Sequence, residues 1–494
     1  MSHRTSPGTS PTTAPAPEPA ATTSRSGRTT PPVLSRTAVG LVLTLALVKG
    51  LSTFAEPDVW WHLRTGDRLR AAFDLVAPDP SAGFAVRDYT ATQWLPEMVA
   101  SAAYAVGGMG AVLWLRAAAV LALVALVYVV ARRYAGRLPA AVAAGLALVG
   151  AGGGLNPRPQ LVSFILFAVT LHACLSMLRD RRPRWWLVPV FWLWACCHGL
   201  WTFGLALGVL LLVAALVDVR TRPTRPEVVR LALLWLACLV AVALTPLGPR
   251  LLLTPFQVAG NASMIADEWR ATPLNNVFAW VALVQLLVCV VAWSRGRRRP
   301  LLWELALLAF AAFCTLWMWR LVPLGSIAVT PLVAAALQSG LTARRERWTR
   351  TERRGLVAFC AGALVVAALA STGLGGKAAA YPADLGPVDQ ALGALPRHSV
   401  VLDDFGISGW LLWAHPDLTP VADLRGEIYA PDHLADYTST LRVEPGWQDF
   451  VARVHPDVAL LARDSALGDA LVHRLGWHRV AATADFVLLA PGDR

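Results

Sequence analysis

Long apolar runs dominate the chain from residue 37 to about residue 374. Each run is roughly 17 to 25 residues long, which is enough to cross a bilayer as a helix. A shorter apolar segment at 94–108 is expected to lie at the membrane surface just before the second span. We place eleven spans, at about 37–55, 110–131, 138–155, 160–178, 185–198, 203–218, 230–247, 275–294, 301–319, 322–340 and 355–374. The pattern predicts a mainly α-helical, polytopic membrane bundle over residues 37–374.

Two regions depart from this pattern. Residues 1–36 are rich in Ser, Thr, Pro and Ala with few large apolar side chains, so we expect a disordered tail. Residues 375–494 hold 16 acids against 9 Lys or Arg. Their short apolar runs SVVLDD, TPVADL, DVALLA and FVLLA alternate with helical patterns at 426–441 and 464–475. This alternation predicts a small soluble α/β domain.

The net charge of +12 lies in the loops of one face. Alternate short loops together hold 21 arginines and four acids; these loops are 132–137, 179–186, 219–230, 295–299 and 342–354. Such loops are typical of the cytoplasmic side of a multi-pass protein. We therefore expect a plasma-membrane protein with a cytoplasmic N-terminus and an extracytoplasmic C-terminal domain. The charge reflects topology and does not indicate a nucleic-acid partner.

The loop at 56–96 is the first candidate for chemistry, because long ordered loops are usually functional. It opens with EPDVWWHLRTGDRLR, where Glu56 and Asp58 precede a tryptophan pair and His62 follows Asp58 by one helical turn. Carboxylates, aromatics and a histidine at the mouth of a membrane span are typical of an active site. The alternative is an interfacial helix that Asp58 caps. In either case we expect the tryptophans to anchor the helix at the membrane surface.

By the span count, four further polar side chains share the face of this loop. They are Arg158 in NPRPQ, His198 in the break after the fifth span, Glu268 in DEW, and Arg320 at the end of the ninth span. Ionisable groups at membrane depth usually face a cavity. Arginines there could bind a phosphate, and a carboxylate could act as a general base.

Each of these four residues also has a purely structural explanation. Arg158 and Arg320 could simply end their helices at the interface, and Glu268 could cap a short external helix. His198 could be a histidine whose hydrogen bonds are satisfied where a helix breaks. Among functional motifs, the chain lacks a phosphate-binding P-loop, a dinucleotide-binding GxGxxG after a strand, HExxH and GxSxG.

Several segments resemble the GT-C membrane glycosyltransferases, a class that includes protein O-mannosyltransferases and lipid A-modifying sugar transferases. The resemblance covers nearly the whole chain after residue 37. It rests on DVWWHLRTGDRLR, APDPSAGF, QWLPE, NPRPQ, the WACCHG segment, TPLG, DEW, DDFGISGWLLW and VADLRGEIY. Departures are QWLPEM, which lacks the later Trp-Leu pair of the class, and ISGW where the class pattern has GGY.

The resemblance implies inverting transfer of a sugar from a polyprenyl-phosphate carrier to an envelope acceptor on the outer face. Asp58 would be the catalytic base, with Glu56 as the second candidate. Substrate-binding candidates are His62, Arg158, His198, Glu268 and Arg320. Expected partners are a polyprenyl-phosphate-linked sugar and membrane lipid, with the acceptor open among glycan, lipid and protein. No cofactor is assigned, and a divalent cation stays an open alternative because the loop has Glu56-Pro57-Asp58 and no clear Asp-Glu or Asp-x-Asp pair.

Two other functions are kept as alternatives. One is a non-catalytic scaffold of the cell envelope with the same shape. The other is a transporter, against which we find no inverted repeat and no matching pair of broken helices. Most ionisable residues also lie at span ends, whereas a transporter places them near the middle of the bilayer.

Overall fold

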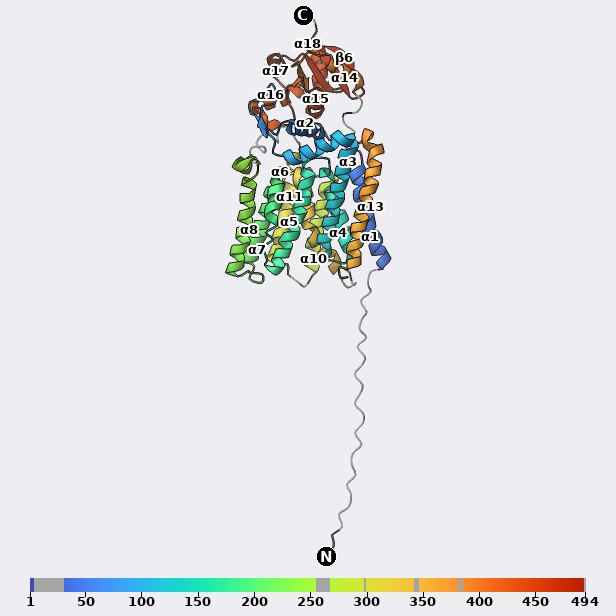
Figure 1. The fold of residues 1–494 in the computed structure, drawn as a ribbon, viewed down its shortest axis with the longest axis vertical. Helices are drawn as coiled ribbons and strands as arrows, with labels where there is room; N and C mark the ends of the chain where they lie inside the picture. The colour runs from blue at the N-terminus through green and yellow to red at the C-terminus, as the bar shows by residue number, and fades with distance from the viewer. Residues whose placement is uncertain are drawn as a thin grey trace.

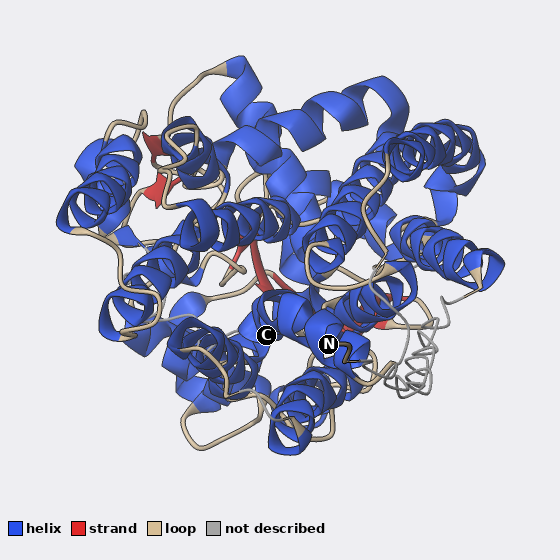
Figure 2. Ribbon diagram, turned by 90° about the horizontal axis from the view of Figure 1, so that it is seen from below, coloured by secondary structure: helices blue, strands red, loops and turns tan. Residues whose placement is uncertain are grey.

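The computed structural model describes residues 1–3, 31–254, 267–296, 299–341, 346–379, 382 and 385–492. Most of the predicted tail therefore lies outside the described residues, and the first helix already begins at Pro32. A bundle of helices forms one part of the molecule, and a small α/β domain covers one end of the bundle (Figure 1). Figure 2 shows the helices nearly end on.

Each predicted span corresponds to one apolar helix of the bundle. The helices are α1 (Pro32–Leu51), α3 (Trp94–Arg132), α4 (Arg137–Gly150), α5 (Gln160–Asp180), α6 (Leu187–Cys197), α7 (Trp201–Val217), α8 (Arg225–Ala243), α10 (Val277–Arg295), α11 (Leu302–Trp317), α12 (Val322–Ser339) and α13 (Arg350–Leu374). By length and composition seven of these can cross a membrane, and α4, α6, α7 and α11 are shorter apolar helices. The chain is a multi-pass membrane protein.

The helices differ in how much of their surface is buried inside the protein. In α12, 78% of the apolar window is buried, so this helix forms the centre of the bundle. In α13 the share is 17%, and side chains such as Val357 and Leu369 are exposed. An apolar helix with so much exposed surface is expected to face lipid.

The long helix α3 changes direction at a glycine pair. Gly107 and Gly108 depart from helical geometry, and Gly108 has a φ of 57°. Positive φ costs glycine little because it has no Cβ. The break separates the first part, which lies across the end of the bundle, from the second part, which passes through it (Figure 1). This agrees with the predicted surface helix at 94–108 followed by a span.

Helix α2 (Asp58–Ala71) lies between the bundle and the C-terminal domain (Figure 1). On one side Gly66 packs so closely on α3 that an added Cβ would lie 2.2 Å from the Glu97 carbonyl oxygen. On the other side Gly409 of α15 (Phe405–Ala414) packs on Pro57, and a Cβ there would lie 2.6 Å from the Pro57 oxygen. These two contacts fix the helix that carries Asp58 between its neighbours.

The tryptophans of α2 pack against protein, whereas the sequence led us to expect that they anchor the helix at the membrane surface. Trp61 is buried in a core shared with the C-terminal domain, and its ring stacks near His62 and meets Tyr89 edge-on. Trp60 contacts Trp413 of the domain, with ring centroids 4.7 Å apart. Aromatic side chains bury large areas, so this pair joins the helix to the domain.

The C-terminal domain is built on a five-stranded sheet of order β4-β3-β5-β7-β6. The strands are β3 (Val400–Asp403), β4 (Thr419–Pro420), β5 (Val458–Ala462), β6 (His478–Ala482) and β7 (Phe486–Ala490). β3 pairs in parallel with β4 and β5, whereas β7 is antiparallel to β5 and β6. The helices are α14 (Gly386–Gly393), α15, α16 (Pro431–Leu441), α17 (Trp447–Val454) and α18 (Ala466–Leu475). A short ladder of β1 (Val76–Ala77) and β2 (Tyr89–Thr90) lies in the loop at 56–96.

A buried arginine joins that loop to the domain. Arg425 bonds Asp423 through two nitrogens, Nε at 3.0 Å and Nη2 at 2.7 Å, and also pairs with Asp79 of the loop. Tyr429 donates its hydroxyl to Asp423 at 2.7 Å. We call these four residues the Arg425 cluster. Its buried charges are paired, as buried charges must be to avoid a large desolvation cost.

Candidate active site

The structure brings all seven predicted site residues to the end of the bundle beneath the C-terminal domain. Each comes from a segment at a helix end, which is why residues far apart in sequence can meet there. The segments are the start of α2 with the residue pair before it, the loop between the 3-10 turn η1 (Gly152–Gly154) and α5, the break between α6 and α7, and the 3-10 turns η3 (Asp267–Trp269) and η4 (Trp319–Leu321).

Arg158 is the centre of the arrangement. Its Nη2 pairs with Glu56 Oε1 at 2.6 Å and with Asp58 Oδ2 at 2.8 Å. Its Nη1 donates to Glu268 Oε2 at 2.8 Å. Arg158 Nε is buried and has no hydrogen-bond partner among the described residues. One guanidinium therefore bonds three carboxylates, and its Nε–H donor is left without a partner among the described residues.

Arg320 extends this arrangement. It pairs with the other oxygen of Glu268, and its guanidinium lies over the Trp269 ring, 5.1 Å from the centroid. Burial alone would raise the pKa of Glu268, but the Arg320 and Arg158 guanidiniums outweigh it and lower the pKa. We call Glu56, Asp58, Arg158, Glu268 and Arg320 the Arg158 cluster.

The two histidines join this cluster from either side. Arg320 Nη2 donates to His198 Nε2 at 3.0 Å, and the Leu200 amide approaches His198 Nδ1 at 3.2 Å. His198 is thus bonded at a helix break and also belongs to the site. His62 Nδ1–H donates to Glu97 Oε1 at 2.8 Å, which orients its ring. Burial lowers the pKa of His62 despite the nearby Glu97, so this imidazole is neutral near pH 7.

Glu56 and Asp58 have different surroundings. Glu56 is 3% exposed and also accepts a hydrogen bond from Asn156 Nδ2 at 2.8 Å. Burial raises the pKa of Glu56 although Arg158 opposes the shift, and the Asp58 carboxylate raises it further. The Asp58 side chain is 17% exposed. Of the two acids, Asp58 is the one that solvent or a substrate reaches more readily.

Two neighbouring cavities border the cluster. One, of about 300 Å³, is lined by Glu56, Asn156 and apolar bundle residues such as Phe278 and Pro323. The other, of about 130 Å³, is lined by Asp58, His62 and residues of the C-terminal domain. Both share a boundary made by Arg158, Gln160, Glu268, Arg320 and Leu424. We call them the bundle lobe and the domain lobe.

The domain contributes residues that sequence reasoning did not assign to the site. Leu424 lines both lobes, and Arg425 and Glu427 line the domain lobe. Burial raises the pKa of Glu427. The signal is present in the motif VADLRGEIY, but nothing in sequence spacing shows which residues of a separate domain line a cavity that the domain covers.

The structure corrects three of the purely structural explanations. Asp58 is the first residue of α2 but makes no capping hydrogen bond, and its carboxylate bonds Arg158. Arg158 and Arg320 are both engaged with carboxylates inside the protein and do not extend to the lipid interface. Glu268 bonds an arginine with each oxygen.

The residues present do not fit a divalent cation. Three carboxylates converge here, but they converge on the Arg158 guanidinium, so a positive charge that the chain itself supplies lies between them. Within the described ranges no group of three or more His, Cys, Asp or Glu side chains is arranged to hold a metal ion. A carboxylate cage for a metal needs oxygens free to coordinate it.

No family model and no curated protein matches the chain, but solved structures do. The oligosaccharyltransferase AglB from Archaeoglobus fulgidus in its apo form aligns with a TM-score of 0.55 and 12% identity over 87% of this chain and 70% of that one. The same enzyme with an inhibitory peptide and a dolichol-phosphate also aligns at 0.55 and 12%, over 93% and 74%. The arabinofuranosyltransferase AftD from Mycobacteria aligns at 0.55 and 16% over 95% of this chain and 40% of its own length. The chain has the fold of the GT-C-type polytopic membrane glycosyltransferases.

Proposed function

We propose that this protein is a membrane glycosyltransferase that moves a sugar from a polyprenyl-phosphate carrier to an envelope acceptor. The observation that carries the proposal is the meeting of Asp58 with Arg158 and Arg320 at a cavity on the end of a bundle with the GT-C fold. An acid beside guanidiniums supplies what the transfer needs, a base for the acceptor and donors for a leaving phosphate.

The bundle lobe suits the carrier. It extends among apolar residues of the membrane helices, and arginines form its polar boundary. A lipid-linked phosphate could approach from the bilayer and bring its phosphate to Arg158 and Arg320, because guanidinium matches phosphate oxygens in pairs. AglB, which shares the fold, binds a dolichol-phosphate.

The domain lobe suits the acceptor. Asp58 and His62 line it together with the Leu424–Glu427 segment of the C-terminal domain. An acceptor hydroxyl or amine there attacks the anomeric carbon of the sugar while Asp58 takes its proton. The bond between the anomeric carbon and the phosphate oxygen breaks, and the carrier leaves as a lipid phosphate. Attack on the face opposite the leaving group inverts the anomeric configuration.

A phosphate that takes two hydrogen bonds from Arg158 requires this arginine to release a carboxylate. Its Nη1 and Nη2 are already bonded to the three carboxylates, while Nε has no partner among the described residues. A phosphate that binds Nε together with Nη2 would displace Glu56 or Asp58 from Arg158. Displacement of Asp58 frees the carboxylate oxygen that bonds Arg158, so that this oxygen can accept the proton of the acceptor.

The proposed location is the outer face of a bacterial plasma membrane. The arginine-rich ends of the bundle helices lie opposite the C-terminal domain, as Arg132 at the end of α3 and Arg350 at the start of α13 illustrate. By the positive-inside rule that end is cytoplasmic. The site beneath the C-terminal domain would then face the cell exterior.

Transfer from a panel of polyprenyl-phosphate sugars tests the proposal. The purified full chain is reconstituted in lipid vesicles, and membranes are added to supply acceptors. The release of labelled sugar from each carrier is measured. We expect one donor to be used by the wild type, and Asp58→Asn to lose about 10²–10⁴-fold of the rate, as for loss of a general base. Asp67→Asn, which changes a half-exposed acid on the same helix, is the matched control and should transfer normally.

Two outcomes would count against this proposal. If Asp58→Asn transfers sugar at the wild-type rate, Asp58 is not the base. If the wild type uses no donor and Asp58→Asn supports the same cellular function, the chain is a non-catalytic scaffold with this fold.

A further inference from the structure

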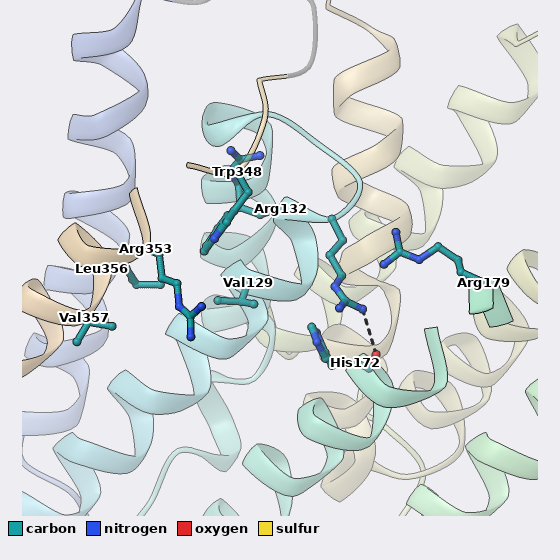
Figure 3. Close-up of a pocket in the computed structure, with 9 residues that line it drawn as sticks. Val129, Arg132, His172, Arg179, Trp348, Arg353, Leu356 and Val357 are labelled. Carbon is teal, nitrogen blue, oxygen red and sulfur yellow. Dashed lines mark hydrogen bonds between the residues drawn. The ribbon is translucent and has the colours of Figure 1, made fainter. Parts of the chain in front are cut away.

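A large cavity lies at the end of the bundle opposite the C-terminal domain, where α3 ends and α13 begins (Figure 1). Figure 3 shows the side chains that line it. It measures about 590 Å³ and lies between the end of α3, the second half of α5 and the start of α13. Its size falls within the range of about 300–1,000 Å³ that is usual for small-ligand sites. The lining residues are Val129, Arg132, Arg133, His172, Arg179, Trp348, Arg353, Leu356 and Val357. We call it the arginine cavity.

Positive charge dominates its lining. Four arginines and His172 line the cavity, and no carboxylate does among the residues described. Arg132 is balanced from outside the cavity by Glu352, with Nε and Oε1 2.6 Å apart. Arg179 and Arg353 are exposed and form no ion pair with a described residue. A cavity with this excess of charge attracts an anion.

One buried polar atom of the lining has no hydrogen-bond partner among the described residues. His172 Nδ1 is buried in α5 in this way, and Arg133 Nη1 approaches the backbone oxygen of the same residue at 3.5 Å. Figure 3 shows the His172 ring between the Arg179 and Arg353 sides of the cavity. Buried polar atoms are nearly always bonded, so an unpaired one indicates a missing partner.

Besides Trp348, the remaining wall is apolar and belongs in part to α13, the helix that we expect to face lipid. Val129, Leu356 and Val357 form it, and Val357 is 63% exposed on the outside of α13. Val365 and Leu369 of the same helix are also exposed, at 61% and 71%. A ligand with a charged head and hydrocarbon chains could bind its head among the arginines and lay its chains along α13.

We propose that the arginine cavity binds the phosphate headgroup of an anionic membrane phospholipid. The phosphate chemistry alone could also come from a free anion, but a free anion gains nothing from the apolar wall or from the open side toward the bilayer. Guanidinium groups recognise phosphate oxygens, and basic residues at the ends of membrane helices bind anionic headgroups. This site lies on the opposite end of the bundle from the Arg158 cluster and does not depend on the transferase proposal.

Lipid retention by the full chain tests this. The purified protein is equilibrated with phosphatidylglycerol or phosphatidylcholine, and bound lipid is counted by native mass spectrometry. The test variant is Arg179→Gln with Arg353→Gln. The matched control is Arg225→Gln with Arg230→Gln, which removes two exposed arginines of α8 outside the cavity. Because each basic residue that contacts an anionic headgroup contributes a factor of about five to its binding, we expect the test variant, but not the control, to bind phosphatidylglycerol about thirtyfold more weakly.

The control should retain phosphatidylglycerol as the wild type does, and phosphatidylcholine should bind weakly to all three proteins. Equal retention by the test variant and the control would overturn the proposal. Inorganic phosphate and soluble glycerophosphoglycerol are added as competitors in separate arms. If either displaces the lipid at the concentration at which the lipid itself saturates, the cavity is a free-anion site and the lipid assignment is wrong. Size-exclusion profiles of the variants identify any that are misfolded, and Arg179→Lys, which keeps the charge, should retain the lipid.

Discussion

The Arg158 cluster and the Arg425 cluster are both arginines among carboxylates, and they lie on either side of one cavity. In the Arg425 cluster the side chains of Arg425 and Asp423 are 3% and 0% exposed. In the Arg158 cluster the side chains of Arg158, Asp58 and Glu268 are 18%, 17% and 25% exposed. The first cluster is closed and joins two parts of the fold. The second borders two lobes and can exchange its partners, which is what a binding site requires.

Loss of the closed cluster should have the largest effect. Arg425→Gln leaves Asp423 buried without its cation and leaves Asp79 paired with Arg68 alone, which costs about 3–5 kcal/mol. We expect a large drop in the unfolding temperature of the full chain in detergent, measured by tryptophan fluorescence. The control is Arg453→Gln, which breaks an exposed pair with Asp436 and should cost less than about 1 kcal/mol. If both variants unfold alike, the Arg425 cluster does not hold the domain in place.

The open cluster should show the reverse pattern. Arg158→Gln removes the central phosphate donor, so we expect sugar transfer to fall by at least about 10²-fold, as for loss of one oxyanion donor. Its unfolding temperature should fall less than that of Arg425→Gln, because Asp58 is partly exposed, Glu268 keeps Arg320, and the buried Glu56 keeps its hydrogen bond from Asn156. Transfer rates and melting curves on the same preparations check this. A variant that is active but strongly destabilised would reverse the roles of the two clusters.

Glu427 tests whether the catalytic acid belongs to the bundle or to the domain. Its carboxyl lines the same lobe as Asp58, and burial raises its pKa. If Asp58 is the base, Glu427→Gln should slow transfer by less than about tenfold, against about 10²–10⁴-fold for Asp58→Asn. Rates with one donor at saturating concentration give this ratio. Equal losses would assign proton transfer to the domain side of the lobe.

Substitution of Asp403 should give the smallest effect, a change in stability that depends on pH. It is fully buried next to the Arg425 cluster, and neither carboxyl oxygen has a hydrogen-bond partner among the described residues. Burial raises its pKa well above the usual range, and the nearby amides offset only part of that shift. A raised folded-state pKa means that the folded protein binds the extra proton. The stabilising contribution of Asp403 is therefore fully present below its unfolded-state pKa of about 3.9. It is lost as the pH rises from there toward the higher pKa that Asp403 has in the folded protein.

Asp403→Asn removes this pH dependence. At neutral pH it should raise the free energy of unfolding by about 1 kcal/mol. Wild-type Asp403 is ionised in the unfolded chain and must take up a proton, or be buried as a charge, when the chain folds, whereas an amide does neither. Melting temperatures of wild type and variant across the acid-to-neutral range measure the difference, which should shrink as the pH is lowered. A difference that grows toward acid pH would show that Asp403 is ionised and paired in the folded protein.

Much of the bundle could be predicted because the membrane imposes length and composition on each helix. The same apolar pattern located the break in α3, and alternation of loops placed Glu56, Arg158 and Arg320 on one face. Strand β6 was missed because its sequence HRVAA is largely exposed at the sheet edge and has no apolar alternation. Half-exposed edge strands give little hydrophobic signal.

The contacts of the site could not be predicted from sequence. The bonding of three carboxylates to Arg158 depends on how the start of α2, the loop before α5 and the turn η3 meet, and no spacing along the chain encodes that. The tryptophans of α2 looked like membrane anchors because interface and core use the same residue types. The arginine-rich loops were interpreted only as topology signals, and the cavity that Arg132, Arg179 and Arg353 form became visible only when α3, α5 and α13 were brought together.

Gly409 has a consequence for any attempt to exchange C-terminal domains between proteins of this fold. Its Cα passes the Pro57 carbonyl so closely that any larger residue would meet the backbone immediately before Asp58. A chimera that carries alanine there would have to lift the domain or shift the start of α2. A transplanted domain can therefore be accepted on this bundle without disturbing the proposed base only if it brings a glycine to the position of Gly409.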